Sequence, residues 1–271
     1  MHGFISRDGV PPDDFRASAR AELSRYPNVE FRAEAAVRAE RTSTDGFIVE
    51  LESGAQLASR KLLLATGLLD ELPNIPDVEA YFGTSVFPCP YCDGWELRDK
   101  PIIVYGRGKR GVEMARSITA WSRQVTLCTQ GSSDLSEDDL QALIRNGIRV
   151  ERSPIAKLEG NAGKLSRVML QNGSAIECEA MFFNLPCRSQ SSLAKMLGCQ
   201  FTSKGGIRCG QYEASSVPGV FVAGNILKDV QLSIVAAAEG AKAAFGINRS
   251  LTREDFARRA GEPAVVDHPG P

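Results

Sequence analysis

The sequence predicts an α/β protein, and three observations carry this prediction. Helical and strand-like segments alternate along most of the chain. Within residues 102–128, an apolar strand, a glycine-rich loop, a helix and a second apolar strand follow one another, as in a βαβ unit. The chain has 271 residues, of which 43% are hydrophobic, and this is enough for one or two domains with cores of their own.

The N-terminal part is predicted to form one helix and several strands. Phe15, Ala19 and Leu23 recur every four residues, so they share one face of a helix. The apolar run that ends before Thr66 and Gly67 suits a strand covered on both faces, because none of its central residues is polar. The predicted elements are a helix at 13–26 and strands at 29–41, 47–51 and 61–65.

The remaining elements follow from apolar runs and from turn and cap signals. Ser136, with an acidic residue at Asp139 three positions later, resembles the start of a helix. In order, we predict a strand at 102–105, a helix at 111–121, a strand at 125–128, a helix after Ser136, strands at 148–151, 168–170, 180–184 and 220–225, and an alanine-rich helix at 231–248. Residues 253–271 are predicted to be a tail, frayed from Gly261 onward.

Composition and charge exclude several classes of protein. The formal net charge is −1, so we predict no nucleic-acid partner. No apolar run approaches the ~18 residues that would span a bilayer, and the first residues lack the layout of a signal peptide. We therefore expect no membrane association and a cytoplasmic location, where most of the seven cysteines would be reduced.

Cys89 and Cys92 form a Cys-Pro-Tyr-Cys pair, which Asp93 and Gly94 follow directly. Two thiols at this spacing can close a small disulfide ring, and a helix that begins there would lower the pKa of an exposed thiol. The other cysteines supply no second close pair, so no metal site is predicted. A glutaredoxin carries the same tetrapeptide, but after an early strand rather than before a glycine loop. A purely structural pair of buried thiols remains the alternative.

The glycine loop is Gly106-x-Gly108-x-x-Gly111, and its position between a strand and a helix favours the binding of a nucleotide pyrophosphate. About twenty residues later, residues 128–131 offer neither an acidic residue for a ribose 2′-hydroxyl nor an arginine for a 2′-phosphate. Lys109 and Arg110 could neutralise phosphates or simply be solvated. We therefore expect weak discrimination between NADH and NADPH.

Three motifs in this order resemble the low-molecular-weight thioredoxin reductases, which are FAD-dependent pyridine nucleotide–disulfide oxidoreductases. They are residues 89–94, residues 104–111 and the segment Pro218-Gly-Val-Phe-Val-Ala-Gly-Asn225. The resemblance implies an α/β fold of two nucleotide-binding (Rossmann-like, ββα-sheet) domains. Residues 1–85 and 200–252 would form a discontinuous FAD-binding-type domain, and residues 86–199 an NAD(P)-binding-type domain that carries the cysteine pair.

The resemblance also implies roles for individual residues. Cys89 would attack the disulfide of the substrate, Cys92 would exchange electrons with the flavin, and Asp93 would shuttle the proton. The implied cofactor contacts are Thr66, Gly67, Gly106, Gly108, Gly111, Gly224, Asn225, Gln231, Leu232 and Ala236. The implied partners are a thioredoxin-like protein or a small dithiol or disulfide, a flavin, possible NADPH or NADH, and a second copy of the chain in a homodimer.

Three features depart from the family. The family opens with a strand, glycine loop and helix for the ADP half of FAD, and this chain lacks that βαβ unit, so it resembles an N-terminally truncated member. We therefore expect FAD to bind weakly or not at all. Asn225 replaces the usual aspartate, and the 2′-phosphate cluster after the second glycine loop is missing.

These departures leave three hypotheses of different classes. The first is a flavin-dependent oxidoreductase that exchanges dithiol and disulfide through Cys89 and Cys92. The second is an NADPH-independent oxidase of small dithiols. The third is a flavin-free fragment with only a thiol-exchange or interaction role.

Overall fold

The computed structural model describes residues 2–44, 46–132 and 134–261, which form two compact units. Unit 1 comprises His2 and residues 70–187, and unit 2 comprises residues 3–69 and the chain from Arg188 onward. This division differs from the predicted one at residues 85–86 and 199–200. Ile75 and Val78 pack in the core of unit 1, and Leu193 and Cys199 pack in the core of unit 2. Both domain boundaries therefore lie closer to the N-terminus than predicted.

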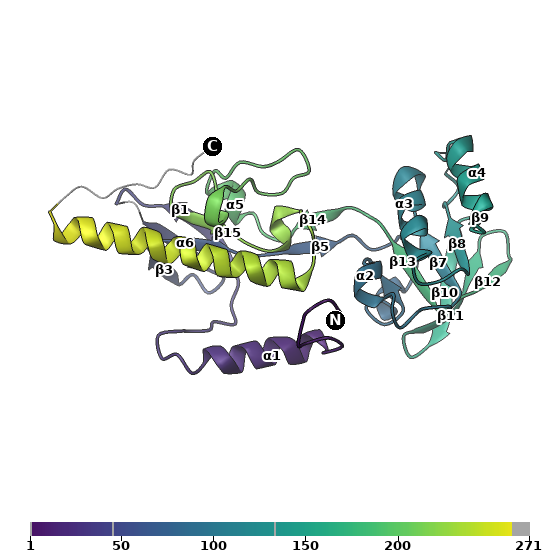
Figure 1. Cartoon of the computed structure of the whole chain (residues 1–271), viewed down its shortest axis with the longest axis horizontal. Coiled ribbons are helices and arrows are strands. Elements are labelled where there is room, and N and C mark those ends of the chain that lie inside the picture. The colour runs from purple at the N-terminus through teal and green to yellow at the C-terminus, as the bar shows by residue number, and fades with distance from the viewer. Residues whose placement is uncertain (1, 45, 133, 262–271) are drawn as a thin grey trace. The chain divides into compact units, whose positions relative to one another are not determined.

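Unit 1 is built on a five-stranded parallel sheet (Figure 1). Its order is β6 (Val86–Phe87), β13 (Ala180–Phe183), β7 (Ile102–Tyr105), β8 (Val125–Cys128) and β9 (Arg149–Glu151). Two helices connect neighbouring strands: α3 (Gly108–Ile118) lies between β7 and β8, and α4 (Glu137–Arg145) between β8 and β9. The βαβ unit predicted from the sequence is therefore present, with α3 beginning at Gly108 instead of Gly111.

Alternation of side chains along these buried strands fills two separate cores. Ile102 and Val104 face the helices, where Val112, Ala115 and Ile118 of α3 cover them. Ile103 and Tyr105 face the other way, toward an antiparallel sheet of β10 (Ile155–Asn161), β11 (Lys164–Leu170) and β12 (Ala175–Glu177). Unit 1 thus has three layers, and its uniformly apolar strands are covered on both faces.

The antiparallel sheet was largely missed from the sequence, since only residues 168–170 were predicted as strand. Its hairpin turns at Ala162 and Gly163, which both have positive φ. Ser85 joins this hairpin to the parallel sheet, because its Oγ donates to the Gly163 carbonyl at 2.6 Å and accepts from the Leu165 N–H at 3.1 Å. Unit 1 also contains η1 (Val78–Ala80) and α2 (Pro90–Asp93).

Ser136 caps α4 as the sequence predicted, because its Oγ accepts from the Asp139 N–H at 3.1 Å. We expect Ser136→Ala to lower the free energy of unfolding by about 1 kcal/mol, the usual value of an N-cap. Both tryptophans, Trp95 and Trp121, lie in unit 1, so tryptophan fluorescence during urea unfolding measures this unit. Ser136→Asp retains an acceptor and is the matched control. Equal stability of the alanine and aspartate variants would contradict the capping role.

Unit 2 contains smaller sheets. β1 (Ala36–Arg41), β2 (Phe47–Leu51) and β3 (Gln56–Ser59) form an antiparallel sheet, and β4 (Leu62–Leu64) pairs in parallel with β15 (Val220–Val222). β5 (Leu68–Asp70) and β14 (Cys187–Ser189) form a third sheet where the chain passes between units. The remaining elements are α1 (Pro12–Leu23), α5 (Leu193–Met196), η2 (Gln211–Glu213), η3 (Asn225–Leu227) and α6 (Ser233–Arg259).

The parallel sheet of unit 2 has an open edge. β15 is the partner of β4 on one side, and among the described residues no strand pairs with the other side. Leu63, in the middle of β4, is 39% exposed. The prediction that both faces of this run are covered is therefore wrong for Leu63, although Leu64 is buried.

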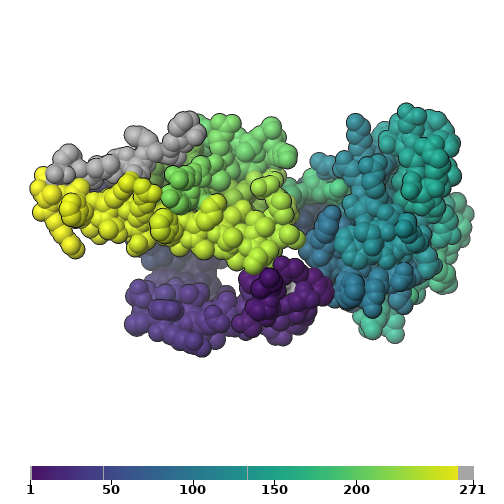
Figure 2. Space-filling view, viewed as in Figure 1, coloured from purple at the N-terminus to yellow at the C-terminus, as the bar shows by residue number. Residues whose placement is uncertain are grey.

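Helix α6 continues past the end predicted at Asn248, through Arg259, and runs along the surface of its unit (Figure 2). Residues 253–259, predicted to belong to a tail, are therefore helical; residues 262–271 lie outside the described part. Other elements are shorter than predicted, since α1 ends at Leu23 and residues 29–35 lie outside β1. In the part of the chain that the structure describes, no helix combines the length and apolarity needed to cross a membrane.

Candidate active site and cofactor-binding residues

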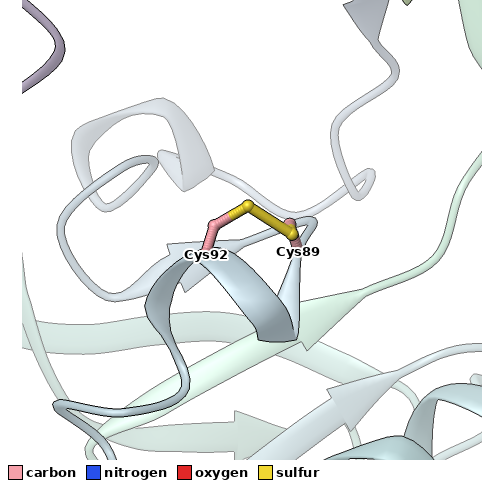
Figure 3. The surroundings of a disulfide bond; sticks show 2 residues. All are labelled: Cys89 and Cys92. Atoms are coloured by element: carbon pink, nitrogen blue, oxygen red, sulfur yellow. A yellow bond between two sulfur atoms is a disulfide. The ribbon is translucent and has the colours of Figure 1, made fainter. Parts of the chain in front are cut away.

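A short helix positions the cysteine pair. Cys89 is the N-cap of α2, with extended backbone at φ −126° and ψ 110°, and Pro90 occupies the first helical position, where its missing N–H costs nothing. Cys89 and Cys92 are joined in a disulfide across Cα atoms 5.4 Å apart (Figure 3). Both residues are half-buried, so the pair is neither sealed in the core nor fully exposed.

The end of α2 rests on Trp121. A Cβ at Gly94 would lie 2.8 Å from the Trp121 ring and 2.5 Å from the Pro90 carbonyl oxygen, so only glycine fits there. Tyr91 meets the same ring edge-on, with 5.3 Å between ring centroids. Trp121, which the sequence did not single out, therefore fixes the turn that carries the cysteine pair.

Asp93 is half-buried directly after Cys92. Burial raises the pKa of its carboxyl from 3.8 to about 6, and the nearby Glu96 carboxylate acts in the same direction. The His2 ring acts in the opposite direction and lowers the pKa of Asp93. The same ring contacts the Glu96 carboxylate. A carboxyl group with a pKa near 6 exchanges its proton close to neutral pH, as a proton shuttle requires.

The glycine loop forms a cradle at the end of β7. A Cβ at Gly106 would lie 2.6 Å from the Gly111 Cα, so this strand and α3 touch backbone to backbone. Gly108 has φ +50°, which favours glycine. The Gly111 N–H donates to the Arg107 carbonyl, whereas within the described chain the N–H groups of Gly108, Lys109 and Arg110 have no acceptor. These donors at a helix N-terminus suit a phosphate.

In unit 2 the structure brings the predicted flavin contacts together on neighbouring strands. Because β4 and β15 are parallel, Thr66 and Gly67 follow one strand at the same edge where Gly224 and Asn225 follow the other. Ala236 of α6 lies against Gly224, with its Cβ 3.7 Å from the position of a Gly224 Cβ. Gln231 and Leu232 immediately precede the same helix.

Two polar groups decide how this edge could hold a ligand. The Gly224 N–H donates to Glu239 Oε2 at 2.7 Å, so this amide is already occupied by a side chain that the sequence analysis missed. Nothing in the sequence links Glu239 to Gly224, since the contact joins a loop to the second turn of α6. The Thr66 hydroxyl, by contrast, is buried with no hydrogen-bond partner among the described residues. An orphaned hydroxyl beside a glycine is compatible with a polar ligand.

The predicted site residues therefore form two sets, each within its own unit. Unit 1 holds the disulfide, Asp93 and the glycine loop, whereas unit 2 holds the seven residues predicted to contact a flavin. Elsewhere in the described residues, no three His, Cys, Asp or Glu side chains are grouped as metal ligands would be.

Burial separates the cysteine pair from two other thiols. Burial raises the pKa of both Cys128 and Cys178 to about 12. After reduction, we expect iodoacetamide at neutral pH to label Cys89 first and Cys92 next, and to leave Cys128 and Cys178 unmodified. Peptide mass spectrometry measures the order, and the urea-unfolded chain, in which all thiols should react alike, is the control. Early labelling of Cys128 would count against a redox role for the pair.

Comparisons with known proteins identify the class. The family model described as pyridine nucleotide-disulphide oxidoreductase matches residues 12–240. The chain therefore belongs to the pyridine nucleotide-disulphide oxidoreductases, a family of enzymes. Within this family its relatives are thioredoxin reductase-like, which confirms the resemblance seen in the sequence.

Two fungal proteins are among the relatives named as thioredoxin reductases. The protein called "Probable thioredoxin reductase" of Arthroderma benhamiae is 27% identical over 84% of this chain. Thioredoxin reductase tcpT of Claviceps purpurea is 30% identical, over 85% of this chain and 76% of its own. This chain spans 64% of the length of the Arthroderma protein.

Solved structures agree with the fold. HlmI is 34% identical and superposes with a TM-score of 0.91, over 96% of this chain and 82% of its own. An oxidoreductase of Agrobacterium tumefaciens is 29% identical, with a TM-score of 0.83 over 93% and 84% of the two chains. These matches confirm the predicted α/β fold of Rossmann-like type.

Proposed function

We propose that this chain is a flavin-dependent oxidoreductase that exchanges dithiol and disulfide through Cys89 and Cys92. The observation that carries the proposal is the Cys89–Cys92 disulfide at the start of α2, followed by a half-buried carboxyl group with a pKa of about 6. A half-buried disulfide can be reached by a second thiol, whereas a purely structural one would gain nothing from a protonatable neighbour.

Three residues of unit 1 would carry out successive steps of the exchange. A bound flavin would supply or accept the electron pair of the disulfide. Once the disulfide is reduced, the Cys89 thiolate attacks one sulfur of the substrate disulfide, and the other substrate sulfur leaves as a thiolate. Cys92 then attacks Cys89 in the mixed disulfide, which releases the second substrate sulfur and restores the original bond. Asp93 takes up or returns the proton of the thiol that forms or ionises.

The residues of unit 2 would hold the flavin. Thr66, Gly67 and Asn225 lie together at the carboxyl ends of β4 and β15. The Thr66 hydroxyl and the Asn225 side chain make no hydrogen bond with the described residues. Gln231, Leu232 and Ala236 would contact the ring system. The chain has no second Gly-x-Gly-x-x-Gly loop in this unit. We therefore propose that FAD binds weakly, since a glycine loop ahead of a helix is what would hold its pyrophosphate.

The partner we propose is a thioredoxin-like protein or a small disulfide or dithiol, acted on by a homodimer in the cytoplasm. NADH or NADPH at the glycine loop is the proposed electron donor. The disulfide partner follows the names of the relatives, and the nucleotide follows the free N–H groups of Gly108, Lys109 and Arg110. The homodimer follows the resemblance to the thioredoxin reductases.

Flavin absorbance tests the proposal. The chain is mixed with excess FAD, passed through a desalting column and scanned between 350 and 500 nm, and NADH-driven reduction of a small aromatic disulfide is then followed with FAD kept in excess. Flavin-dependent reduction that stops in the Cys89→Ser variant supports the proposal. Flavin that is reduced only by dithiols and reoxidised by oxygen would favour the oxidase. No flavin effect at all would leave the fragment hypothesis and overturn the proposal.

A further inference from the structure

The loop after β8 returns to the glycine loop. Asp134 lies six residues beyond the last residue of β8, yet its Cβ lies 3.6 Å from where a Gly108 Cβ would be, and its carbonyl oxygen lies 3.9 Å from the same point. The Asp134 N–H donates to the Ser132 hydroxyl at 3.2 Å, which holds the loop in this position. A carboxylate therefore stands beside the second glycine of the cradle.

This carboxylate is available to a ligand. The Asp134 side chain is exposed, and it makes no hydrogen bond or ion pair with the described residues. In a dinucleotide-binding βαβ unit, a carboxylate near the end of the second strand accepts from the ribose 2′-hydroxyl, whereas a 2′-phosphate requires an arginine there. The sequence places no acidic group at residues 128–131, but the fold brings one back from further along the chain.

We propose that Asp134 is the residue that selects the dinucleotide, accepting from the ribose hydroxyls of NADH and repelling the 2′-phosphate of NADPH. This inference rests on the proposed use of the glycine loop by a nicotinamide nucleotide. It replaces the expectation of weak discrimination, which considered only residues 128–131.

Three positive charges on the glycine loop would favour NADPH instead. Arg107, Lys109 and Arg110 are all exposed, and each could attract a phosphate. NADH and NADPH both carry a pyrophosphate, however, and the N–H groups at the start of α3 would bind it. We therefore assign these three cations to the pyrophosphate rather than to a 2′-phosphate. Asp134 adds the opposite preference at the second glycine, because a carboxylate accepts a hydrogen bond from a hydroxyl and repels a further phosphate.

Equilibrium binding tests the inference without turnover. The Kd values of NADH and NADPH are measured by calorimetry for the full chain and for Asp134→Asn, at a fixed ionic strength. We expect the full chain to bind NADH at least about tenfold more tightly, which is about 1.4 kcal/mol. In Asp134→Asn this preference should largely disappear, chiefly through tighter binding of NADPH.

Asp138→Asn is the matched control, since it removes an exposed carboxylate from the first turn of α4 and should leave the preference unchanged. A preference for NADPH in the full chain, or a ratio unaffected by Asp134→Asn, would overturn the inference. Failure of every variant to bind either nucleotide would overturn it as well. The proposed function is judged separately, because reduction of a substrate disulfide through Cys89 and Cys92 can be driven by chemically reduced FAD with no nucleotide present.

Discussion

Replacement of either cysteine of the pair is expected to abolish disulfide exchange, with a loss of at least about a hundredfold, because no other thiol of the described chain can form the same ring. The two variants should fail differently. Cys92→Ser retains the attacking thiol and should accumulate a mixed disulfide between Cys89 and the substrate, whereas Cys89→Ser should form none. Intact-protein mass spectrometry after mixing with a small aromatic disulfide measures the adduct.

Cys209→Ser is the control for this pair of variants. Cys209 as a whole residue is exposed and forms no disulfide, but partial burial of its sulfur raises the pKa of the thiol, so it should contribute little. Full exchange activity in Cys92→Ser, or a loss in Cys209→Ser comparable to that in Cys89→Ser, would contradict the assigned roles.

Asp93→Asn should make the protein more stable at neutral pH and slower in exchange. The folded-state pKa of about 6 lies above the ordinary 3.8, so the carboxylate is unfavourable in the folded state once it ionises. The wild-type chain should therefore lose stability as the pH rises from about 4 to 6 and keep that penalty above pH 6. The full difference corresponds to about 3 kcal/mol, and partial solvation of the group reduces our expectation to about 1–2 kcal/mol.

Urea unfolding followed by tryptophan fluorescence at pH 4.5 and 7.5 measures this effect in unit 1. The difference between wild type and Asp93→Asn isolates the one carboxyl group, since other groups titrate in both proteins. Glu113→Gln, which removes an exposed carboxylate on α3, should show no comparable dependence on pH. If Asp93→Asn is less stable than the wild type at pH 7.5, burial is not what governs this group.

Local patterns in the sequence predicted the centre of unit 1 well. The strands at 102–105 and 125–128 were predicted with the bounds that the structure shows, because each is a short apolar run between polar or glycine residues. The Ser136 cap was visible for the same reason, since the capping hydroxyl and the Asp139 N–H that donates to it lie three positions apart.

Contacts between distant segments could not be predicted. The charged stretch after Thr252 has the composition of a tail, yet it is helical because Glu254 meets Arg60 and Lys61 near the start of β4, which lie more than 190 residues earlier. The same limit applies to the site. The cysteine pair and both glycine motifs are contiguous in sequence, whereas Glu239 at Gly224 and Asp134 at Gly108 become neighbours only when the chain folds.

The anchoring of α6 has a practical consequence for anyone who shortens this chain for crystallisation. Trimming at Thr252 looks harmless from the composition, but it would delete Glu254, which contacts Lys61 and lies 2.7 Å from Arg60. The Lys61 side chain is only 12% exposed, so its ammonium group would be left partly dehydrated and without its carboxylate partner among the described residues. A cut after Gly261 keeps these contacts and is the boundary we would choose.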